Sequence, residues 1–331
     1  MIAKNFNILA GDVGGTNTRL AIFTFDGHQL HLDTQGRYPS ASYPSLGAIL
    51  EQFLNPSPRN LRAACLGIPG PIQKGKARTT NLPWTIEKTK LARAWNIPHF
   101  TIINDLAAQA LGIAHLAPGD IITLQKGDAP AQGNQCLVSP GTGLGEAGLF
   151  WDGKTHHVWA CEGGHTDFAP RNEVEIALLQ YLIKRFGHVS VERVVSGTGL
   201  LNIYQFLRDT QPGPEKPSIT TEIFSSSAPG QVISAYATTC PLCSKTIEIF
   251  LSSLAAEAGN MALKTMATGG VFIGGGIPPK ILPLLQTPEF LENFNSKGRL
   301  TPLMQSMPVH VILSDETALL GAAHHALKNF T

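Results

Sequence analysis

The chain has 331 residues, 43% of them hydrophobic, and its 25 Lys and Arg nearly cancel its 24 Asp and Glu. This length allows about two domains with cores of their own, and the lack of any run of about five Lys or Arg argues against a nucleic-acid or anionic-membrane binder. No apolar run approaches the roughly 18 residues of a membrane span, the N-terminus has no signal-peptide core, and the five cysteines form no disulfide framework, so we expect a cytoplasmic protein with reduced thiols that acts on small molecules.

The first third of the chain predicts a mixed α/β unit that opens with a meander. Apolar alternation bounded by turn residues predicts strands, and apolar spacing of three to four residues predicts helices. The expected strands are 6–10, 18–25, 29–34, 63–67 and 99–103, and the expected helices are 45–54 and 86–95.

The remainder of the chain is strand-rich at first and then mostly helical. A Pro/Ser-rich loop at 211–217 interrupts the helical region. The expected elements are a helix at 105–116, strands within 133–168, helices at 173–186, 196–207 and 241–266, a strand at 309–313 and a closing helix at 317–329.

The stretch LAGDVGGTNTRLAIF, residues 9–23, interrupts two strand-like runs with glycines and small polar residues. Glycine lets backbone N–H groups approach an anion, so Gly14, Gly15 and Thr16 can hold phosphate oxygens. Asp12 would repel a polyphosphate unless a divalent cation lay between them, which implies Mg²⁺ held through water by this carboxylate. An ordinary β-turn is the alternative, because Asp and Gly are common turn residues.

Two further glycine clusters follow. CLVSPGTGLGEAGLF repeats the pattern of strand, Gly/Thr turn and strand, which indicates either two similar halves facing one cleft or a chance similarity of two hairpins. GGVFIGGGIPPK ends a short apolar strand in three glycines, which either let a flat ring approach the backbone or form a tight packing turn. GLFWDGKT fits the written pattern of a Walker phosphate loop, but its bulky strand residues and its Asp-Gly pair predict a hairpin instead.

Several acids and one histidine suggest sugar chemistry. Asn104-Asp105 follows the apolar run FTII and starts a helix, so Asp105 is either an N-cap or a general base at a strand end. CEGGHTDF supplies Glu162 and His165, and ERVVSGTG supplies Glu192, which are groups that can hydrogen-bond sugar hydroxyls. His165 with Asp167 could instead bind a metal, but a third ligand at recognisable spacing is lacking.

Cys240 and Cys243 form the only CxxC pattern, at the start of a predicted helix. No second CxxC completes a zinc site. A structural role is therefore favoured over a redox or metal role.

Nearly the whole chain carries a series of ordered motifs. They are LAGDVGGTNTRLAIF, LGIPGPI, NLPW, INDLAAQALGI, SPGTGLGEAGLF, EGGHTDFAP, HVSVERVVSGTGL and GGVFIGGGIPPK. In this order they resemble bacterial glucokinase, of the hexokinase-like group within the actin-like ATPase superfamily.

The resemblance implies a fold, a domain division and an activity. The fold would be the two-domain α/β fold of actin-like ATPases (ribonuclease H-like), with mixed sheets flanked by helices around a central cleft. A small domain would comprise 1–110 and 316–331, a large domain 111–315, and the active site would lie in the cleft between them. The activity would be ATP-dependent phosphorylation of D-glucose to D-glucose 6-phosphate with Mg²⁺, by a cytoplasmic homodimer.

The same resemblance assigns site residues, with Asp105 as the catalytic aspartate and Asp12 as the acid that organises Mg²⁺ through water. The glucose-binding positions fall on Asn104, Asp105, Glu162, His165 and Glu192. The ATP-binding positions fall on Gly11, Asp12, Val13, Gly14, Gly15, Thr16, Gly141, Thr142, Gly143, Gly274, Gly275 and Gly276. The chain departs from the usual family pattern at Ser139-Pro140 and Glu146 and in the adjacent prolines after Gly276.

Two other protein classes remain as alternatives. An actin-like or chaperone-like ATPase without sugar phosphorylation needs no sugar pocket, so Glu162, His165 and Glu192 argue against it. A sugar-responsive transcription regulator of the same superfamily commonly carries a CxCGxxGCxE zinc cluster, which this sequence lacks.

Overall fold

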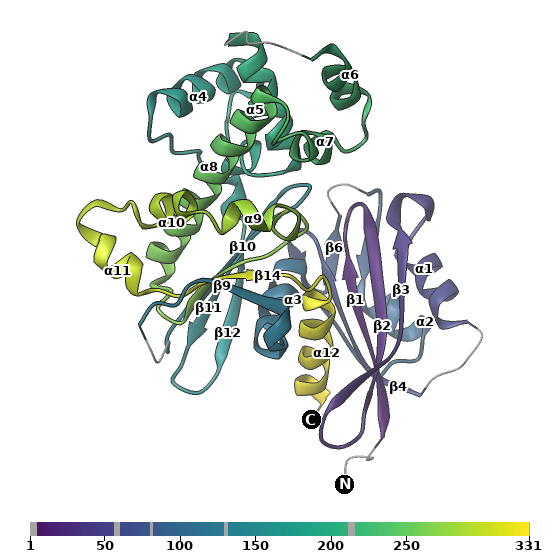
Figure 1. The fold of residues 1–331 in the computed structure, drawn as a ribbon. Helices are drawn as coiled ribbons and strands as arrows, with labels where there is room; N and C mark the ends of the chain where they lie inside the picture. The colour runs from purple at the N-terminus through teal and green to yellow at the C-terminus, as the bar shows by residue number, and fades with distance from the viewer. Residues whose placement is uncertain (1–4, 56–59, 80–81, 129–131, 211–215, 331) are drawn as a thin grey trace. The chain divides into compact units, whose positions relative to one another are not determined.

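A computed structural model describes residues 5–55, 60–79, 82–128, 132–210 and 216–330. Residues 80–81, the second of which is the first residue of the NLPW motif, and residues 211–215 of the predicted Pro/Ser-rich loop lie outside these ranges. The chain divides into two compact units, one formed by Met1–Gly119 with Ser314–Thr331 and the other by Asp120–Leu313 (Figure 1).

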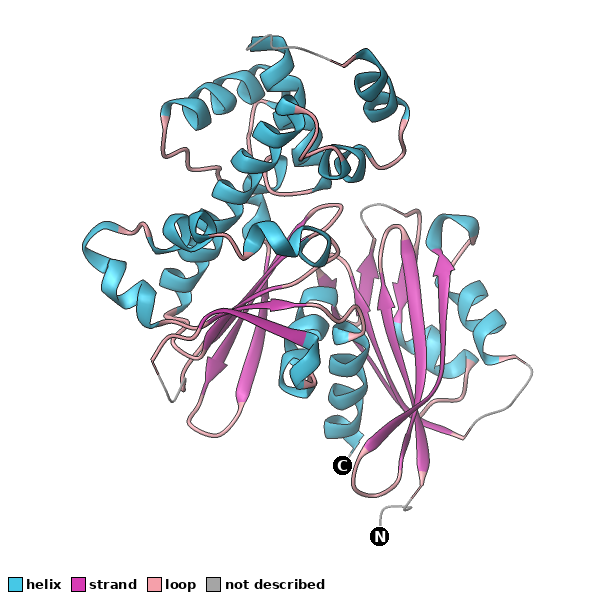
Figure 2. Cartoon of the chain, viewed as in Figure 1, coloured by secondary structure: helices cyan, strands magenta, loops and turns pink. Residues whose placement is uncertain are grey.

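The first unit contains two sheets and four α-helices within its described residues (Figure 2). Its strands are β1 (Phe6–Val13), β2 (Asn17–Phe25), β3 (Leu30–Pro39), β4 (Leu61–Ile68), β5 (Ile72–Gln73), β6 (Lys76–Arg78), β7 (Thr85–Glu87) and β8 (His99–Asn104). Its α-helices are α1 (Leu46–Leu54), α2 (Lys88–Ala94), α3 (Asp105–Gly112) and α12 (Thr317–Phe330), and 3₁₀ turns occur at η1 (Ser40–Ser42) and η2 (Ile113–His115). A further 3₁₀ turn, η3 (Pro118–Asp120), spans the boundary between the units.

The large sheet of this unit has the strand order β3-β2-β1-β4-β8, in which β1, β4 and β8 are parallel. Alternate residues of β1 point to opposite faces, as the period of a strand requires. Leu9 therefore joins the core that contains α1, whereas Ile8 joins the core that contains α12. Because both faces are covered, β1 is almost entirely apolar until it reaches Asp12.

One predicted helix in this unit begins later than expected. The sequence predicts a helix over 86–95, but Thr85–Glu87 forms β7 and pairs with β6, so that α2 starts only at Lys88. Ile86 is buried in the core opposite Ala77, and the packing of this β-branched side chain on a sheet outweighs the helical pattern that follows it. The small sheet β5-β6-β7 is not predicted by the sequence patterns.

The second unit contains one large sheet and a mostly helical region. Its strands are β9 (Ile121–Gln125), β10 (Gln135–Pro140), β11 (Leu144–Trp151), β12 (His156–Cys161), β13 (Gly270–Ile273) and β14 (Val309–Ile312). Its α-helices are α4 (Glu173–Phe186), α5 (Gly197–Thr210), α6 (Pro217–Ser225), α7 (Pro229–Ala235), α8 (Pro241–Thr265), α9 (Leu282–Leu285), α10 (Pro288–Asn295) and α11 (Thr301–Ser306). Its 3₁₀ turns are η4 (Gly163–His165), η5 (Val191–Arg193), η6 (Pro278–Ile281) and η7 (Gly298–Leu300).

The sheet of the second unit has the order β12-β11-β10-β13-β14-β9. Its first five strands repeat the arrangement of the first unit: an antiparallel meander, β12-β11-β10, continues into the parallel strands β13 and β14. The two Gly/Thr hairpins occupy equivalent places in the two sheets, so the sequence similarity between them reflects two similar halves. Among the described residues, no helix combines the length and apolar character needed to cross a bilayer.

Candidate active site

The first predicted phosphate turn is a hairpin between β1 and β2. Gly14 donates its N–H to the carbonyl of Asn17 at 2.9 Å, which closes the turn. Ser40, fully buried, donates its hydroxyl to the carbonyl of Gly14 at 2.7 Å and its N–H to the carbonyl of Thr16 at 3.0 Å. These bonds use the N–H of Gly14 and the carbonyls of Gly14, Thr16 and Asn17. The N–H groups of Gly15 and Thr16 therefore remain to bind an anion.

Three of the predicted nucleotide-binding residues belong to the strand that precedes the turn. Gly11, Asp12 and Val13 pair with Leu20, Arg19 and Thr18 in the β1–β2 ladder. The side chain of Val13 is fully buried, and Gly11 packs under Leu66 and Leu20. Only Asp12 of the three offers a side chain that is open to a ligand, with 18% of it exposed.

Asp12 forms an ion pair with Arg19, the residue directly opposite it in the hairpin. Arg19 Nη2 donates to Asp12 Oδ2 at 2.9 Å. Arg19 Nη1 contacts the carbonyl and the carboxylate of Asp315, at the start of the segment that leads into α12. The guanidinium thus fixes the carboxylate of Asp12 and adds a positive charge next to the turn, which is a favourable setting for phosphate.

Asp105 is the first residue of α3 and directly follows the last residue of β8. The helix is capped by Asn104, whose Oδ1 accepts the N–H groups of Leu106 at 3.0 Å and Ala107 at 3.2 Å. Asp105 Oδ1 also accepts the N–H of Leu106, at 3.0 Å. Asn104 therefore performs the main capping role that the sequence left open for Asp105, and its amide nitrogen remains as a donor group.

The sheet brings Asp12 and Asp105 to the same edge. Gly67 of β4 pairs with Asp12 on one side and with Ile103 of β8 on the other. A β-carbon at Gly67 would lie 3.0 Å from the β-carbon of Ala108, 3.3 Å from the α-carbon of Asp105 and 3.6 Å from the carbonyl oxygen of Gly11. A glycine at this position is what allows α3 to lie so close to β4.

In the second unit, the predicted nucleotide turn and one of the predicted sugar acids are in direct contact. Glu192, in η5, accepts the N–H of Leu144 through Oε2 at 2.9 Å. Gly143 lies against the same carboxylate, where a β-carbon would overlap Glu192 Oε2. Gly141 accepts the N–H of Gly197 at 2.8 Å, at the start of α5. These bonds leave Thr142 exposed at the tip of the turn.

The turn Glu162–His165 lies at the same end of β11 as Glu192 and the Gly141–Gly143 turn. It begins where β12 ends, and His165 donates its N–H to the carbonyl of Glu162 at 3.0 Å. The side chains of Glu162 and His165 are 63% and 61% exposed, and His165 Nε2 lies 4.0 Å from Glu162 Oε2. Gly164 packs onto the carbonyl of Leu144, so this turn, Glu192 and the Gly141–Gly143 turn all meet at the start of β11.

The third glycine cluster lies beside the second turn. Gly274 donates its N–H to the carbonyl of Val138 at 2.9 Å, and Ile277 donates to the carbonyl of Pro140 at 3.3 Å. Gly275 has a φ of 87°, and a β-carbon there would lie 2.9 Å from the hydroxyl of Ser139. Gly276 faces open space. Ser139-Pro140, a departure from the family pattern, is therefore the surface on which this cluster rests.

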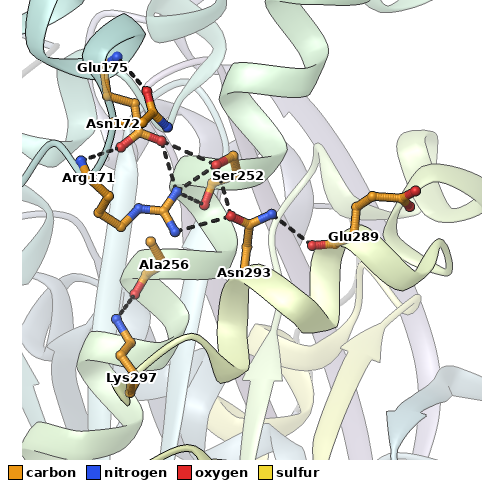
Figure 3. Close-up of polar contacts among 8 residues, drawn as sticks. All are labelled: Arg171, Asn172, Glu175, Ser252, Ala256, Glu289, Asn293 and Lys297. Atoms are coloured by element: carbon orange, nitrogen blue, oxygen red, sulfur yellow. Dashed lines mark hydrogen bonds and ion pairs between the residues drawn. The ribbon is translucent and has the colours of Figure 1, made fainter.

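The chain that follows the Glu162–His165 turn is anchored by a polar network (Figure 3). Arg171 forms an ion pair of 2.8 Å with Glu175, which is 98% buried at its side chain, and donates its own N–H to the same carboxylate at 2.7 Å. Ser252 of α8 donates to Glu175 at 3.2 Å, and Arg171 donates to Asn293 of α10 at 3.2 Å. Asn172 caps α4 by accepting the N–H of Glu175 at 2.9 Å. The network ties the segment after the turn to α8 and α10.

Two of the sequence motifs supply none of the groups described above. GLFWDGKT forms the end of β11 and the hairpin turn into β12, which confirms that it is no Walker loop. Cys240 and Cys243 are buried and form no disulfide. Burial, with a smaller effect of Cys240, raises the pKa of Cys243 to about 12, so its thiol stays protonated and unreactive.

Sequence reasoning assigned no function to two residues that the structure places beside the predicted groups. Arg19 could have been found by counting across the hairpin, because it is the register partner of Asp12. Gly67 stands within the quoted LGIPGPI motif, but only the tertiary contact with α3 gives it a function.

Comparison with known sequences identifies one protein family. A sequence profile of the Glucokinase family matches residues 9–329. A glucokinase from Nostoc punctiforme is 42% identical over 335 aligned positions, which cover 96% of this chain and 97% of the relative. One from Synechocystis sp. is 37% identical and covers 98% of both chains.

Solved structures show the same fold. The crystal structure of a glucokinase from an Antarctic psychrotroph has a TM-score of 0.81 and 31% identity, covering 97% of this chain and 99% of its own. A ROK family glucokinase from Streptomyces griseus, solved in complex with glucose and AMPPNP, has a TM-score of 0.63 and 17% identity, covering 97% of this chain and 99% of its own. The expected α/β fold of actin-like ATPases is confirmed, and the chain belongs to the glucokinase family, whose members are kinases that phosphorylate glucose.

Proposed function

We propose that the chain transfers the γ-phosphoryl group of ATP to the 6-hydroxyl of D-glucose and releases D-glucose 6-phosphate and ADP. The observation that supports this most directly is the pair of carboxylates at one sheet edge: Asp12 beside a phosphate-type turn and Asp105 at the start of α3, with Gly67 between their strands. The Streptomyces griseus structure with glucose and AMPPNP supports glucose and ATP as the substrates.

Asp105 is the proposed general base. It accepts the proton of the 6-hydroxyl as the oxygen attacks the γ-phosphorus, a role worth typically about 10²–10⁴-fold in rate. Its place at the N-terminus of α3 favours the ionised carboxylate that a base requires. Most of the remaining rate enhancement comes from positioning, because phosphoryl transfer needs little other chemistry from the protein.

Glucose hydroxyls would be bound by Asn104, Asp105, Glu162, His165 and Glu192. Asn104 would donate through its amide nitrogen, since its oxygen caps α3. Glu192 already accepts the N–H of Leu144 with one oxygen and would accept a hydroxyl with the other. Paired donors and acceptors of this kind suit a ligand whose every hydroxyl both donates and accepts.

The nucleotide would be held by the three glycine segments. The proposed contacts are those of Gly11, Asp12, Val13, Gly14, Gly15, Thr16, Gly141, Thr142, Gly143, Gly274, Gly275 and Gly276. Given the hydrogen bonds within each turn, the amides of Gly15, Thr16 and Thr142 would carry most of the phosphate binding, whereas Gly11 and Val13 contribute by shaping the strand.

Asp12 fits a hydrated Mg²⁺. Arg19 binds Oδ2, which leaves Oδ1 for the water shell of an ion, and no cluster of three or more His, Cys, Asp or Glu suited to a metal occurs in the part of the chain that the structure describes. A single carboxylate that works together with water and substrate phosphates is the usual protein contribution to such a site. When bound, Mg²⁺ would neutralise charge on the β- and γ-phosphates, while Arg19 keeps the carboxylate in place.

We further propose that the protein acts in the cytoplasm as a homodimer. The nearly neutral charge balance and the free state of the five cysteines support the compartment. Sedimentation analysis of the purified chain tests the assembly.

Asp105→Asn tests the proposed mechanism. The substitution keeps the shape of the side chain but removes the proton acceptor, so turnover should fall by at least about 10²-fold, while glucose binding stays detectable by calorimetry. Asp33→Asn, at an exposed position on β3, is the control. Turnover close to that of the native protein would remove Asp105 from the role of base.

A coupled assay over a panel of hexoses tests the substrate. Glucose 6-phosphate should form with ATP and Mg²⁺, and ADP release should depend on glucose. Glucose-independent ATP hydrolysis without any sugar phosphate would instead support an actin-like ATPase.

A further inference from the structure

Glu146 has a buried side chain, and its carboxyl group has no role in the proposed reaction. It lies on β11 between Val138 of β10 and Cys161 of β12, and only 1% of it is exposed. Neither of its carboxyl oxygens has a hydrogen-bond partner among the described residues. Because burying an unpaired polar group is unfavourable, such a group in a folded protein calls for an explanation.

The carboxyl group of Glu146 lies directly against the turn that carries two of the proposed sugar ligands. A β-carbon at Gly163 would overlap Glu146 Oε2 and would lie 2.8 Å from its Cδ and 3.3 Å from its Cβ. Gly163 is flanked by Glu162 and begins η4, which ends at His165. The carboxyl group is therefore in direct contact with the backbone of this turn.

The charged and titratable groups around Glu146 favour its neutral form. Burial and then the carboxylate of Glu257 on α8 raise the pKa of Glu146 to about 8, against a smaller opposing effect of Lys264. Lys264 pairs with Glu257 at 3.6 Å. The other titratable neighbours are the thiols of Cys136 on β10 and Cys161 on β12, whose pKa values are themselves raised mainly by burial.

We propose that Glu146 is a positioning residue for sugar binding, whose neutral carboxyl group fills the space beneath Gly163 and so holds Glu162 and His165 where they receive glucose. The inference rests on the proposed glucose site. Ionisation would place an unpaired charge under Gly163, which draws in water and displaces the turn. Glucose affinity then falls, while the turn Gly141–Gly143, which precedes β11, keeps its hydrogen bonds.

The first test compares the pH dependence of the KM for glucose in the native protein and in Glu146→Gln, which is neutral at every pH. If only the protonated form binds well, KM in the native protein rises about tenfold between pH 7 and pH 9, in proportion to the loss of the competent fraction. The same ratio in Glu146→Gln should stay close to one. Glu248→Gln, an exposed carboxyl on α8, is the control and should show the native ratio. Equal ratios in the native protein and in Glu146→Gln would overturn the inference.

The second test uses the contact itself. Gly163→Ala inserts a methyl group where Glu146 Oε2 stands, so it should raise KM for glucose by about tenfold or more, by analogy with other small displacements of a positioned group. Adding Glu146→Ala removes the oxygens and makes room for the methyl group, so the double variant should recover a large part of this loss. A double variant no better than Gly163→Ala alone would overturn the inference, because the two side chains would then not compete for one space.

Glu162→Ala separates this inference from the proposed function on which it rests. An unchanged KM for glucose in Glu162→Ala would overturn the proposed glucose site and this inference with it. A raised KM in Glu162→Ala together with native pH behaviour in Glu146→Gln would overturn the inference alone. Thermal unfolding of each variant establishes that the KM values belong to folded protein.

Discussion

Gly67 offers a direct test of how closely the base must be positioned. The residue has no catalytic atoms, but its α-carbon faces the first turn of α3, where Asp105 begins the helix. Gly67→Ala would add one methyl group at this contact. The new β-carbon would lie 3.0 Å from the β-carbon of Ala108 and 3.3 Å from the α-carbon of Asp105, whereas carbon atoms prefer separations of about 3.5–4.0 Å.

The helix must therefore move away from β4 by roughly half an ångström. A displacement of about 1 Å can reduce catalysis by about 10²-fold, so we expect kcat to fall by about tenfold. The free energy of unfolding should fall by about 1–3 kcal/mol, as for other overpacked sites. KM for ATP should change little, because the turn Gly14–Thr16 is held by Ser40 rather than by α3.

The assay couples glucose 6-phosphate formation to NADP reduction and yields kcat and KM for each substrate. Gly119→Ala is the control, because a β-carbon there meets nothing within 4 Å. A kcat within twofold of the native value, in a variant that unfolds at a lower temperature, would refute the reasoning. It would mean that the strain is absorbed without moving Asp105.

Two further predictions concern stability. Glu175→Gln should lower the free energy of unfolding by about 1–3 kcal/mol in chemical denaturation, because the buried carboxylate loses its charge-assisted bonds from Arg171, whose own side chain is 27% exposed. Glu173→Gln, exposed on the same helix, should change the free energy of unfolding little, and equal effects of the two would contradict this account. His324 stacks on His115 with ring centroids 3.3 Å apart, and burial, then His115, lower its pKa from 6.5 to about 4. Between pH 6.5 and pH 4 the unfolded chain therefore binds a proton at His324 that the folded chain does not, so the folded protein has its full stability above pH 6.5 and loses it as pH falls toward 4. His324→Phe should reduce this acid-induced loss in the free energy of unfolding by up to about 2 kcal/mol. An unchanged loss of stability at acid pH would exclude His324 as its cause.

Much of the fold could be predicted because its signals are local. Helix α4 spans the predicted residues 173–186, since Asn172 caps it and Gly187 ends it. The closing helix is likewise found within one residue of its predicted end, at Phe330. The small sheet β5-β6-β7 escaped prediction because its strands have only two or three residues, too few to display a period.

Residue types and their spacing along the chain were enough to indicate the family, the two Gly/Thr hairpins and the acids suited to bind a sugar and a metal-bound phosphate, because each of these features is formed by neighbours in sequence. The contacts that shape the site join residues far apart in sequence: Glu192 meets Leu144, Gly67 admits α3, and Glu146 lies under Gly163. Such contacts depend on how sheet and helices pack, and a residue's partners across the core leave no mark in its own neighbourhood. Only the folded chain could show that a carboxyl group noted as a departure from the family pattern lies against the turn proposed to bind glucose.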